Sequence, residues 1–426
     1  MIRGIKRNLR FNDERSDFVK EFPLSKGELE KLTEQYPTPF HIYDEERIIR
    51  NLRELQEAFK WAEFKEYFAV KALPNPAILK ILKRQGAGAD CSSLAELKLA
   101  GMAGLSGEEI ILTSNDTPLE EFKLAREIGA IINLDDLTHL EYVRRGVGLP
   151  ELLCFRYNPA DRMNSGNDII GRPHEAKYGL TREQMIEGYR RAREMGVKRF
   201  GLHTMVVSNE RETSAFLRTA EIMFELAQEL REREGIELEF INLGGGVGLA
   251  YRPEEKAADL KEIGAGIKGL YERILRGRRP RLLMESGRFI TGSAGWLVSR
   301  VIHQKHTYKE YVGLDSCMAD LMRPALYGAY HHITILGKED AEATKVYDVT
   351  GSLCENNDKF AIDRRLPEVE IGDLLIIHDT GAHGHAMGFN YNGKLRHAEL
   401  LIRTNGQVEM IRRAERLEDY FATLKF

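Results

Sequence analysis

Lys71 is the residue of this chain whose type and position most clearly suggest covalent chemistry. It ends the apolar, β-like run that begins at Tyr67, and a Pro/Asn break and a new helical pattern follow at once. A lysine ammonium is costly to bury unless its charge is paired or used chemically. A strand that delivers a lysine into a site therefore makes it a candidate for Schiff-base formation with a carbonyl compound. Most strand lysines instead face solvent, so Lys71 alone does not establish a site.

Other polar residues occupy similar positions, each at the end of a short apolar run. They are Asp90, Arg156, His203, the glycines from Gly244, and Glu285. Each also has an ordinary structural explanation. His203 could occupy a hydrogen-bonded core position, Asp90 could cap a helix, and Arg156 could pair with an acid. Glu285 could be one of the many acids of the chain, and tight turns also use glycine. Because all of them lie at strand ends, a common site is the better interpretation.

The elements that would position these residues alternate regularly after residue 38. An opening unit, Phe40–Tyr43 and then Glu45–Lys60, leads into apolar runs separated by helical patterns, which favours parallel strands joined by helical crossovers. The runs lie at 65–71, 87–91, 109–113, 130–134, 152–157, 199–205, 239–244 and 281–285. Eight parallel strands close a (β/α)8 TIM-like barrel, whose functional groups gather at the carboxyl ends of the strands. We predict an α/β barrel over residues 38–286.

The character of the chain changes after residue 286. Strand-like runs dominate, with little helix between them until Arg412–Leu424. The expected strands are 296–303, 311–315, 332–336, 345–350, 374–378, 397–403 and 407–411. This pattern predicts a second, antiparallel β-domain, a small barrel or sandwich built from residues 1–37 and 287–426.

Composition excludes several classes of partner. The formal net charge is only −4, and no segment concentrates one sign, so neither nucleic acid nor an anionic membrane is expected as a partner. No apolar run is long enough to span a bilayer, and the N-terminus lacks the apolar core of a signal peptide. The four cysteines lie far apart and form no C-x-x-C pair, which indicates a reducing compartment, so we predict a cytoplasmic protein. His383 and His385 have no acidic or cysteine residues beside them, so we predict no metal site.

The loop Gly244-Gly-Gly-Val-Gly248 suggests a phosphate site. Glycines allow backbone N–H groups to approach and surround a phosphate. A dinucleotide fingerprint is excluded, because its last glycine would fall at Leu249, and no Walker lysine is present. With Lys71 at the same end of the barrel, the loop favours an aldehyde cofactor that carries a phosphate.

The chemistry of pyridoxal 5'-phosphate matches these residues. An acid such as Glu285 would keep the pyridine nitrogen protonated, which makes the ring a strong electron sink for a carbanion. The flat imidazole of His203 would stack on the ring. Cys354 is a candidate proton donor to the carbanion, because thiols can transfer protons near neutral pH. Decarboxylation needs such a sink more than racemisation does.

The chain resembles the fold-type III pyridoxal phosphate decarboxylases, the group that includes diaminopimelate and ornithine decarboxylases. The matching stretches occur in family order over nearly the whole chain. They are Tyr67–Asn75, Gly86–Glu96, Gly201–Ser208, Asn242–Gly248, Glu285–Arg288, Arg323–Tyr327, Gly351–Asp358 and Gly381–Asn392.

The resemblance implies a role for each matching residue. Lys71 would hold the cofactor as a Schiff base, His203 would stack on the ring, and Glu285 would pair with its nitrogen. Cys354 would be the proton donor, reaching across a homodimer interface into the neighbouring subunit's site. Phosphate contacts would come from Ser208, Gly245, Gly246 and Tyr391, and the cofactor-binding set would be completed by Asp90, Arg156, Gly287 and Arg288.

The resemblance also implies an amino-acid substrate. Arg323, Tyr327 and Glu355 match positions that recognise the distal end of diaminopimelate, an arginine for the carboxylate and a glutamate for the ammonium. Arg288, His383 and Tyr391 complete the expected substrate-binding set. The structural alternative for Arg323 and Glu355 is a salt bridge at a domain interface.

Several positions depart from the family pattern. The diaminopimelate enzymes read His-Cys-His-Ile-Gly-Ser-Gln where this chain has His203-Thr-Met-Val-Val-Ser-Asn209, so Val207 replaces a glycine of the phosphate loop and predicts local remodelling. Ser286 stands in place of a proline, and His383 in place of a tyrosine that contacts substrate. The Cys354–Asp358 segment reads Cys-Glu-Asn-Asn-Asp rather than Cys-Glu-Ser-Gly-Asp.

The leading prediction is a decarboxylase that converts meso-2,6-diaminopimelate to L-lysine. A decarboxylase of another diamino acid (ornithine, lysine or arginine, L or D) is the first alternative, because the departures lie around the substrate. A racemase is a weaker alternative, because that chemistry tends to pair the ring nitrogen with a base rather than an acid. A non-catalytic regulatory binding protein would not need Lys71 and Cys354.

Overall fold

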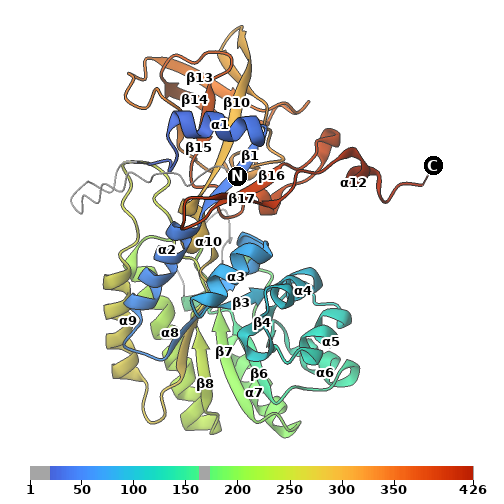
Figure 1. The fold of residues 1–426 in the computed structure, drawn as a ribbon. Helices are drawn as coiled ribbons and strands as arrows, with labels where there is room; N and C mark the ends of the chain where they lie inside the picture. Colours follow the sequence, from blue (N-terminus) through green and yellow to red (C-terminus); the bar gives the residue numbers. More distant parts are fainter. Residues whose placement is uncertain (1–19, 163–172, 426) are drawn as a thin grey trace. The chain divides into compact units, whose positions relative to one another are not determined.

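The structure, a computed structural model, describes residues 20–162 and 173–425 (Figure 1). The described chain divides into two compact units. The barrel unit consists of Ile49–Leu249 and Ala258–Phe289. The sheet unit consists of the described residues through Ile48, Ala250–Ala257, and the chain from Ile290 onward.

The barrel unit confirms the predicted (β/α)8 architecture. Its strands form one closed parallel barrel, each paired with the next in sequence and the last with the first. They are β2 (Phe64–Ala69), β3 (Gly88–Cys91), β4 (Ile110–Thr113), β5 (Ile131–Leu134), β6 (Leu152–Tyr157), β7 (Arg199–Thr204), β8 (Leu238–Asn242) and β9 (Arg281–Met284). All of these strands lie within the predicted runs or within one residue of them.

Helices follow the strands on the outside of the barrel, as the labelled elements of Figure 1 show. They are α3 (Pro76–Arg84), α4 (Leu94–Met102), α5 (Leu119–Glu127), α6 (Leu137–Gly146), α7 (Arg182–Glu194), α8 (Thr213–Glu234) and α9 (Leu260–Ile274), preceded by α2 (Glu45–Ala58). Local capping fixes where several of them begin. Asn75 accepts a hydrogen bond from the Ala77 amide and precedes a proline at the first helical position, and Thr181 forms a capping box with Gln184.

The interior of the barrel is a packed core rather than a channel. A layer of buried side chains fills it: Tyr67, Ile111, Ile131, Leu152, Cys154, Phe240 and Leu283. Gly201 makes room for Phe240, because a Cβ there would lie 2.0 Å from the Phe240 ring. The packed interior leaves the carboxyl ends of the strands as the place where polar side chains gather.

The sheet unit contains a nine-stranded sheet with the central order β14-β13-β11-β10-β1-β16-β17, in which β15 also pairs with β10 and β12. The strands are β1 (Phe40–Asp44), β10 (Gly295–His306), β11 (Glu310–Leu314), β12 (Ile333–Ile335), β13 (Lys345–Thr350), β14 (Lys359–Leu366), β15 (Leu374–Ile377), β16 (Ala398–Ile402) and β17 (Val408–Arg412). Helices α1 (Lys26–Gln35), α10 (Gly287–Thr291), α11 (Arg323–Tyr327) and α12 (Leu417–Phe421) complete the described helices.

Three expectations for this region need correction. The sheet is mixed rather than antiparallel, because β1 runs parallel to β16 and β11 parallel to β13. Strand β14 lies outside the predicted strands, since its pattern of charged and apolar residues lacks clear alternation. The expected helix Arg412–Leu424 shrinks to α12, because residue 412 still belongs to β17.

The boundary expected at residue 38 also differs from the division in the structure. Strand β1 pairs with β10 and β16 of the sheet unit, and the short segment Ala250–Ala257 belongs to the sheet unit as well. In the described residues no helix is both long and apolar enough to cross a membrane.

Candidate functional site

Glu285 is the centre of a buried polar cluster at the carboxyl end of the barrel. It follows β9 directly and is buried. His203 Nε2 lies 3.1 Å from its Oε2, and Asn242 Nδ2 donates to its Oε1 over 2.6 Å. The Oδ1 atom of Asn242 accepts from the Gly244 amide over 2.9 Å, which fixes the orientation of the Asn242 side chain. Both oxygens of the carboxyl group are therefore held by donors.

The strand register explains why these residues meet. Arg156 of β6 is the register partner of His203 of β7, which in turn is the partner of Asn242 of β8. On the other side of the barrel, Ala69 of β2 pairs with Asp90 of β3. Residues that are register partners in parallel strands lie at one level of the barrel, so the predicted site residues converge.

Lys71 lies just beyond Ala69, the last residue of β2, in the short 3-10 turn Val70–Ala72. Its neighbours Val70 and Ala72 are buried, whereas the lysine itself is exposed. Its positive charge acts to lower the pKa of both Asp90 and Glu285, which places the ammonium group in their electrostatic neighbourhood, although the pKa of Asp90 is raised on balance. The turn therefore presents Lys71 towards the cluster rather than into the core.

The pKa values of Asp90 and Glu285, two carboxyl groups that interact with Lys71, are shifted in opposite directions. Burial raises the pKa of Asp90 well above its usual value, and the charge of Glu285 adds to the rise against the smaller effect of Lys71. Burial also acts to raise the pKa of Glu285, but the charge and hydrogen bond of His203, with Lys71 and Arg156, outweigh it and the pKa falls. Of the two groups, Glu285 is therefore the stronger acid, and Asp90 holds its proton to higher pH.

Arg156 is oriented by two neighbours that sequence reasoning did not identify. Its Nη1 lies 3.5 Å from Oδ1 of Asp135, and its guanidinium carbon lies 3.9 Å from the centre of the Tyr178 ring. A cation that stacks on an aromatic face and pairs with an acid is held in a defined position. Arg156 therefore contributes positive charge to Glu285 from a fixed position.

The glycine loop packs against the segment that follows His203. The Gly245 amide donates to Sδ of Met205 over 3.2 Å, although a thioether is a weak acceptor. Gly246 has a φ of +93°, and a Cβ there would lie 2.3 Å from the Val207 carbonyl oxygen. The buried Val207 thus lies with its backbone close to the glycine loop, and the half-buried Ser208 follows it.

The Glu285–Arg288 segment brings the last predicted barrel residues to the same end. A Cβ at Gly287 would lie 2.7 Å from Cβ of Ala72, so the segment passes directly beside the turn that carries Lys71. Arg288 follows in α10. The Ser286 amide donates to Glu66, a fully buried acid whose pKa is raised well above normal by burial. A proline at position 286 would have no N–H to make this bond.

Some polar atoms of the barrel cluster remain available for a ligand. Nδ1 of His203 and Oδ1 of Asp90 are buried and have no hydrogen-bond partner within the described residues. Unpaired buried polar atoms cost free energy, so such atoms in a site are typically satisfied when a ligand binds. His203 and Asp90 therefore offer these two atoms to a ligand at the carboxyl end of the barrel.

The other predicted site residues belong to the sheet unit. Arg323 is buried there, where its Nη1 lies 3.0 Å from the Tyr251 hydroxyl and 2.8 Å from His331 Nε2. His331 Nδ1 lies 2.8 Å from the carbonyl oxygen of His378, so Nδ1 is the protonated nitrogen and Nε2 the acceptor. Tyr327 ends the same short helix α11. The Tyr251 and His331 contacts therefore orient the Arg323 guanidinium.

The Cys354 loop and the 379–392 segment carry the remaining residues. Cys354 is exposed, whereas the other three cysteines are buried. Oε1 of Glu355 accepts from the Asn357 amide over 3.2 Å, which turns the loop back on itself. His383 and Tyr391 lie on the second segment, where Asp379, His383 and Asn392 all adopt left-handed backbone conformations. Such conformations in residues other than glycine concentrate at functional sites.

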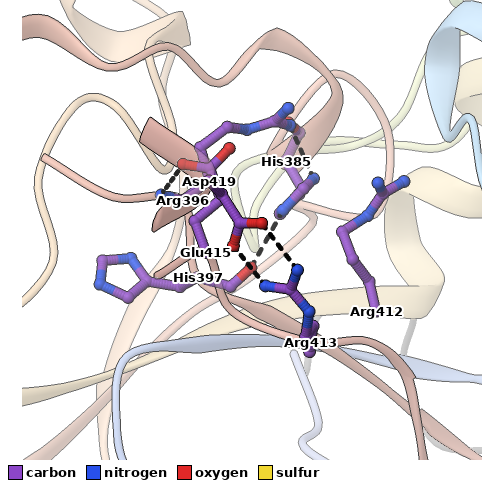
Figure 2. Close-up of a pocket in the computed structure, with 7 residues that line it drawn as sticks. All are labelled: His385, Arg396, His397, Arg412, Arg413, Glu415 and Asp419. Atoms are coloured by element: carbon purple, nitrogen blue, oxygen red, sulfur yellow. Dashed lines mark hydrogen bonds and ion pairs between the residues drawn. The ribbon is translucent and has the colours of Figure 1, made fainter. Parts of the chain in front are cut away.

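A cavity of about 300 Å³ lies in the sheet unit beside this second segment (Figure 2). It is lined by His385, Arg396, His397, Arg412, Arg413, Glu415 and Asp419. Arg413 forms an ion pair with Asp419, and Arg412 forms one with the buried Glu399. Oε2 of Glu415 accepts a hydrogen bond from the Arg396 backbone N–H over 2.8 Å. The described residues contain no group of three or more His, Cys, Asp or Glu arranged to hold a metal ion.

The comparisons with known proteins agree with this geometry. Residues 45–292 match the family described as "Pyridoxal-dependent decarboxylase, pyridoxal binding domain". The chain is 45% identical over 405 residues to Protein TabA of Pseudomonas amygdali pv. tabaci, covering 95% of this chain and 94% of that protein. It is 35% identical over 396 residues to diaminopimelate decarboxylase of Methanothermobacter thermautotrophicus, covering 91% and 92%.

A solved structure extends the agreement to the fold. The crystal structure of diaminopimelate decarboxylase from Helicobacter pylori, complexed with L-lysine, matches with a TM-score of 0.86 and 28% sequence identity. The match covers 92% of this chain and 98% of that chain, so it includes both units.

Proposed function

Since this chain belongs to the pyridoxal-dependent decarboxylases of the diaminopimelate decarboxylase type, we propose that it converts meso-2,6-diaminopimelate to L-lysine and carbon dioxide. The observation that carries the proposal is the ionised Glu285, held between His203 and Asn242 beside Lys71. A buried carboxylate in this position suits a protonated pyridine nitrogen. The available atoms of His203 and Asp90 and the side-chain-free glycine loop fit pyridoxal phosphate.

In the proposed decarboxylation each site residue has a separate role. Pyridoxal phosphate supplies an electron sink for the bonding electrons that remain on the substrate carbon when carbon dioxide leaves. Lys71 would provide the amine that attaches the cofactor, and Glu285 would hold the proton on the ring nitrogen. The Gly245 and Gly246 backbone, Ser208 and Tyr391 would bind the phosphate. The substrate carbon exchanges its carboxylate for a proton, which Cys354 of the neighbouring subunit in a homodimer donates from Sγ and regains from solvent.

Arg323 and Glu355 provide the basis for the substrate proposal. A guanidinium oriented by the Tyr251 hydroxyl and His331 suits a carboxylate of the ligand. Glu355 would bind the distal ammonium group, with Tyr327, His383 and Arg288 around the substrate. The Methanothermobacter relative is a diaminopimelate decarboxylase and matches over nearly its whole length, which supports the same substrate class.

A decarboxylase of another diamino acid is the second candidate, and one comparison favours it. The identity to Protein TabA, a name that specifies no substrate, is 45%, compared with 35% for the Methanothermobacter enzyme. The departures at Thr204–Val207 and His383 lie where the family contacts phosphate and substrate. A changed pocket at these positions would change the substrate while leaving Lys71, Glu285 and Cys354 in place.

A substrate panel separates the two candidates. The purified protein is incubated with pyridoxal phosphate and with meso-diaminopimelate, ornithine, lysine or arginine, each as both enantiomers where they exist, and carbon dioxide is measured. We expect release from meso-diaminopimelate. Release from a different diamino acid alone would overturn the substrate proposal and retain the enzyme class. The control is Lys71→Ala, which should lose both turnover and the borohydride-sensitive absorbance band of the bound cofactor.

A further inference from the structure

The Asn392 side chain joins the Cys354 loop to the 385–397 segment of the same unit by a hydrogen bond. Oδ1 of Asn392 accepts a hydrogen bond from the backbone N–H of Cys354 over 2.9 Å. Asn392 has φ +55° and ψ +20°, a left-handed conformation in which asparagine is tolerated better than most residues. Asparagine in turns commonly bonds its own local backbone, whereas here its carbonyl oxygen reaches a residue 38 positions away.

The 385–397 segment, which carries Asn392, is itself held by several side-chain hydrogen bonds. Nη2 of Arg396 lies 2.9 Å from Nδ1 of His385, and the same guanidinium also bonds the His385 carbonyl oxygen. Asn390 Nδ2 donates to the Lys394 carbonyl oxygen over 2.9 Å and to Oε2 of Glu415 over 2.7 Å. Several of these residues line the cavity in Figure 2, where Arg396 and Glu415 lie together. Asn392 therefore lies on a segment that these hydrogen bonds hold in place.

The carboxylate of Asp358 provides a second set of hydrogen bonds that hold the Cys354 loop. Oδ2 of the buried Asp358 accepts from the Leu353 amide over 2.7 Å, and its Oδ1 accepts from the Met318 amide over 2.6 Å. Asp358 thus fixes the residue before the cysteine, and Asn392 fixes the cysteine itself. Phe389 of the 385–397 segment also packs against the apolar cluster that contains Leu353. Consecutive backbone amides held by two different acceptors leave the Cys354 backbone little freedom.

We propose that Asn392 is a positioning residue for the Cys354 thiol, placing it for proton transfer through the bond to the Cys354 amide. This inference rests on the proposed role of Cys354 as the proton donor. A catalytic group on an exposed loop needs such support, because misplacement by about 1 Å can cost on the order of 10²-fold in rate. The adjacent Tyr391 places a proposed phosphate contact on the same segment, so the two functions share one support.

The test compares Asn392→Gly with Asn392→Asp. Glycine accepts the left-handed backbone but removes the acceptor, whereas aspartate keeps an acceptor oxygen at the same position. For Asn392→Gly we expect kcat to fall about tenfold, with KM and cofactor Kd within about twofold of the wild-type values. Asn392→Asp should retain kcat within about threefold. Asn405→Gly is the matched control, because Asn405 Oδ1 also accepts a backbone N–H, from Gln407, in a turn away from the Cys354 loop.

Hydrogen exchange of the protein without cofactor gives an independent readout. The Cys354 amide should be protected in the wild-type protein and in Asn392→Asp, and should exchange at least about tenfold faster in Asn392→Gly. Rapid exchange of this amide in the wild-type protein would overturn the inference even if Asn392→Gly failed to fold. An unchanged kcat in Asn392→Gly, with kcat lowered in Cys354→Ala, would also overturn it. If Cys354→Ala itself kept full kcat, the proposed role of Cys354 would fail instead.

Discussion

Nε2 of His203 donates to Oε2 of Glu285 over 3.1 Å, although the two residues are 82 positions apart in the sequence. The bond joins the ends of strands β7 and β9 across the intervening β8, whose Asn242 donates to the other oxygen. Since His203 donates from Nε2, its buried Nδ1 is the atom that has no partner among the described residues. The bond therefore sets both the charge of Glu285 and the orientation of the imidazole.

Replacing Asn242 with Ala should destabilise the protein without its cofactor. The change leaves Oε1 of a buried carboxylate without a donor, which costs roughly 1–3 kcal/mol in the free energy of unfolding. The pKa of Glu285 is depressed in the folded state, so this stabilisation exists above the unfolded pKa of about 4.3 and is lost as pH falls. Urea unfolding at pH 7 and pH 4 should therefore show the larger difference from wild type at pH 7.

The control for Asn242 is Asn405→Ala in the exposed turn between β16 and β17. Its effect on the free energy of unfolding should stay within about 0.5 kcal/mol. A loss for Asn242→Ala that is the same at both pH values would contradict the assignment of an ionised Glu285.

Replacing Asp90 with Asn should have the opposite pH dependence. The pKa of Asp90 is raised by burial and by Glu285. Above the unfolded value of about 3.9 the unfolded chain releases this proton while the folded chain keeps it, so folding is progressively disfavoured as pH rises towards the folded pKa. The asparagine side chain does not titrate, so we expect the Asp90→Asn variant to gain stability relative to wild type as pH rises above about 4. A difference that stays constant as pH rises would contradict a raised pKa of Asp90.

The barrel is predictable from sequence because its signals are local. Each strand is a short apolar run, several helices have their own caps, and the polar residue at each strand end can be identified without knowing its partner. Asp90, Arg156, His203 and Glu285 are therefore candidates from sequence alone. That Arg156, His203 and Asn242 lie side by side depends on register, which no single segment encodes.

The missed features depend on contacts distant in sequence. The pairing of β1 with β10 and β16 joins residues far apart in the chain, such as Phe40 with Val298, and its parallel partner gives no local signal. The bond from the Gly245 amide to Met205 and the cation–aromatic contact of Arg156 with Tyr178 likewise arise only in the folded barrel. Asn242 had one available signal, its position at the end of a strand.

Two glycine substitutions should have opposite effects on stability. At Gly246 the φ of +93° and the approach to the Val207 carbonyl oxygen leave no room for a Cβ, so Gly246→Ala should destabilise the protein by at least about 1 kcal/mol. At Gly269, inside α9, a Cβ would meet nothing within 4 Å, so Gly269→Ala should stabilise it by about 0.5–1 kcal/mol. Thermal and urea unfolding measure both. Equal effects of the two changes would contradict the described packing of the glycine loop.

A mixing experiment tests whether Cys354 serves the site of a neighbouring subunit, as the proposed homodimer requires. Lys71→Ala and Cys354→Ala should each be nearly inactive alone. In a mixed dimer, one site would lose both residues and the other would combine an intact Lys71 with the partner's Cys354. Random reassociation of equal amounts makes half of the dimers mixed, each with one complete site, so activity should recover to about a quarter of the wild-type value.

The mixture also distinguishes the other arrangements. If Cys354 acted within its own subunit, no mixed dimer would contain a complete site, and the activity of the mixture would remain that of the separate variants. A monomer in analytical ultracentrifugation would give the same result and would remove the homodimer from the proposal. Mixing Lys71→Ala with Glu285→Gln is the matched control, because both residues lie in the barrel unit and each barrel of a mixed dimer lacks one of them. No recovery is expected in this control, so recovery confined to the mixture with Cys354→Ala would identify Cys354 as the residue supplied by the partner.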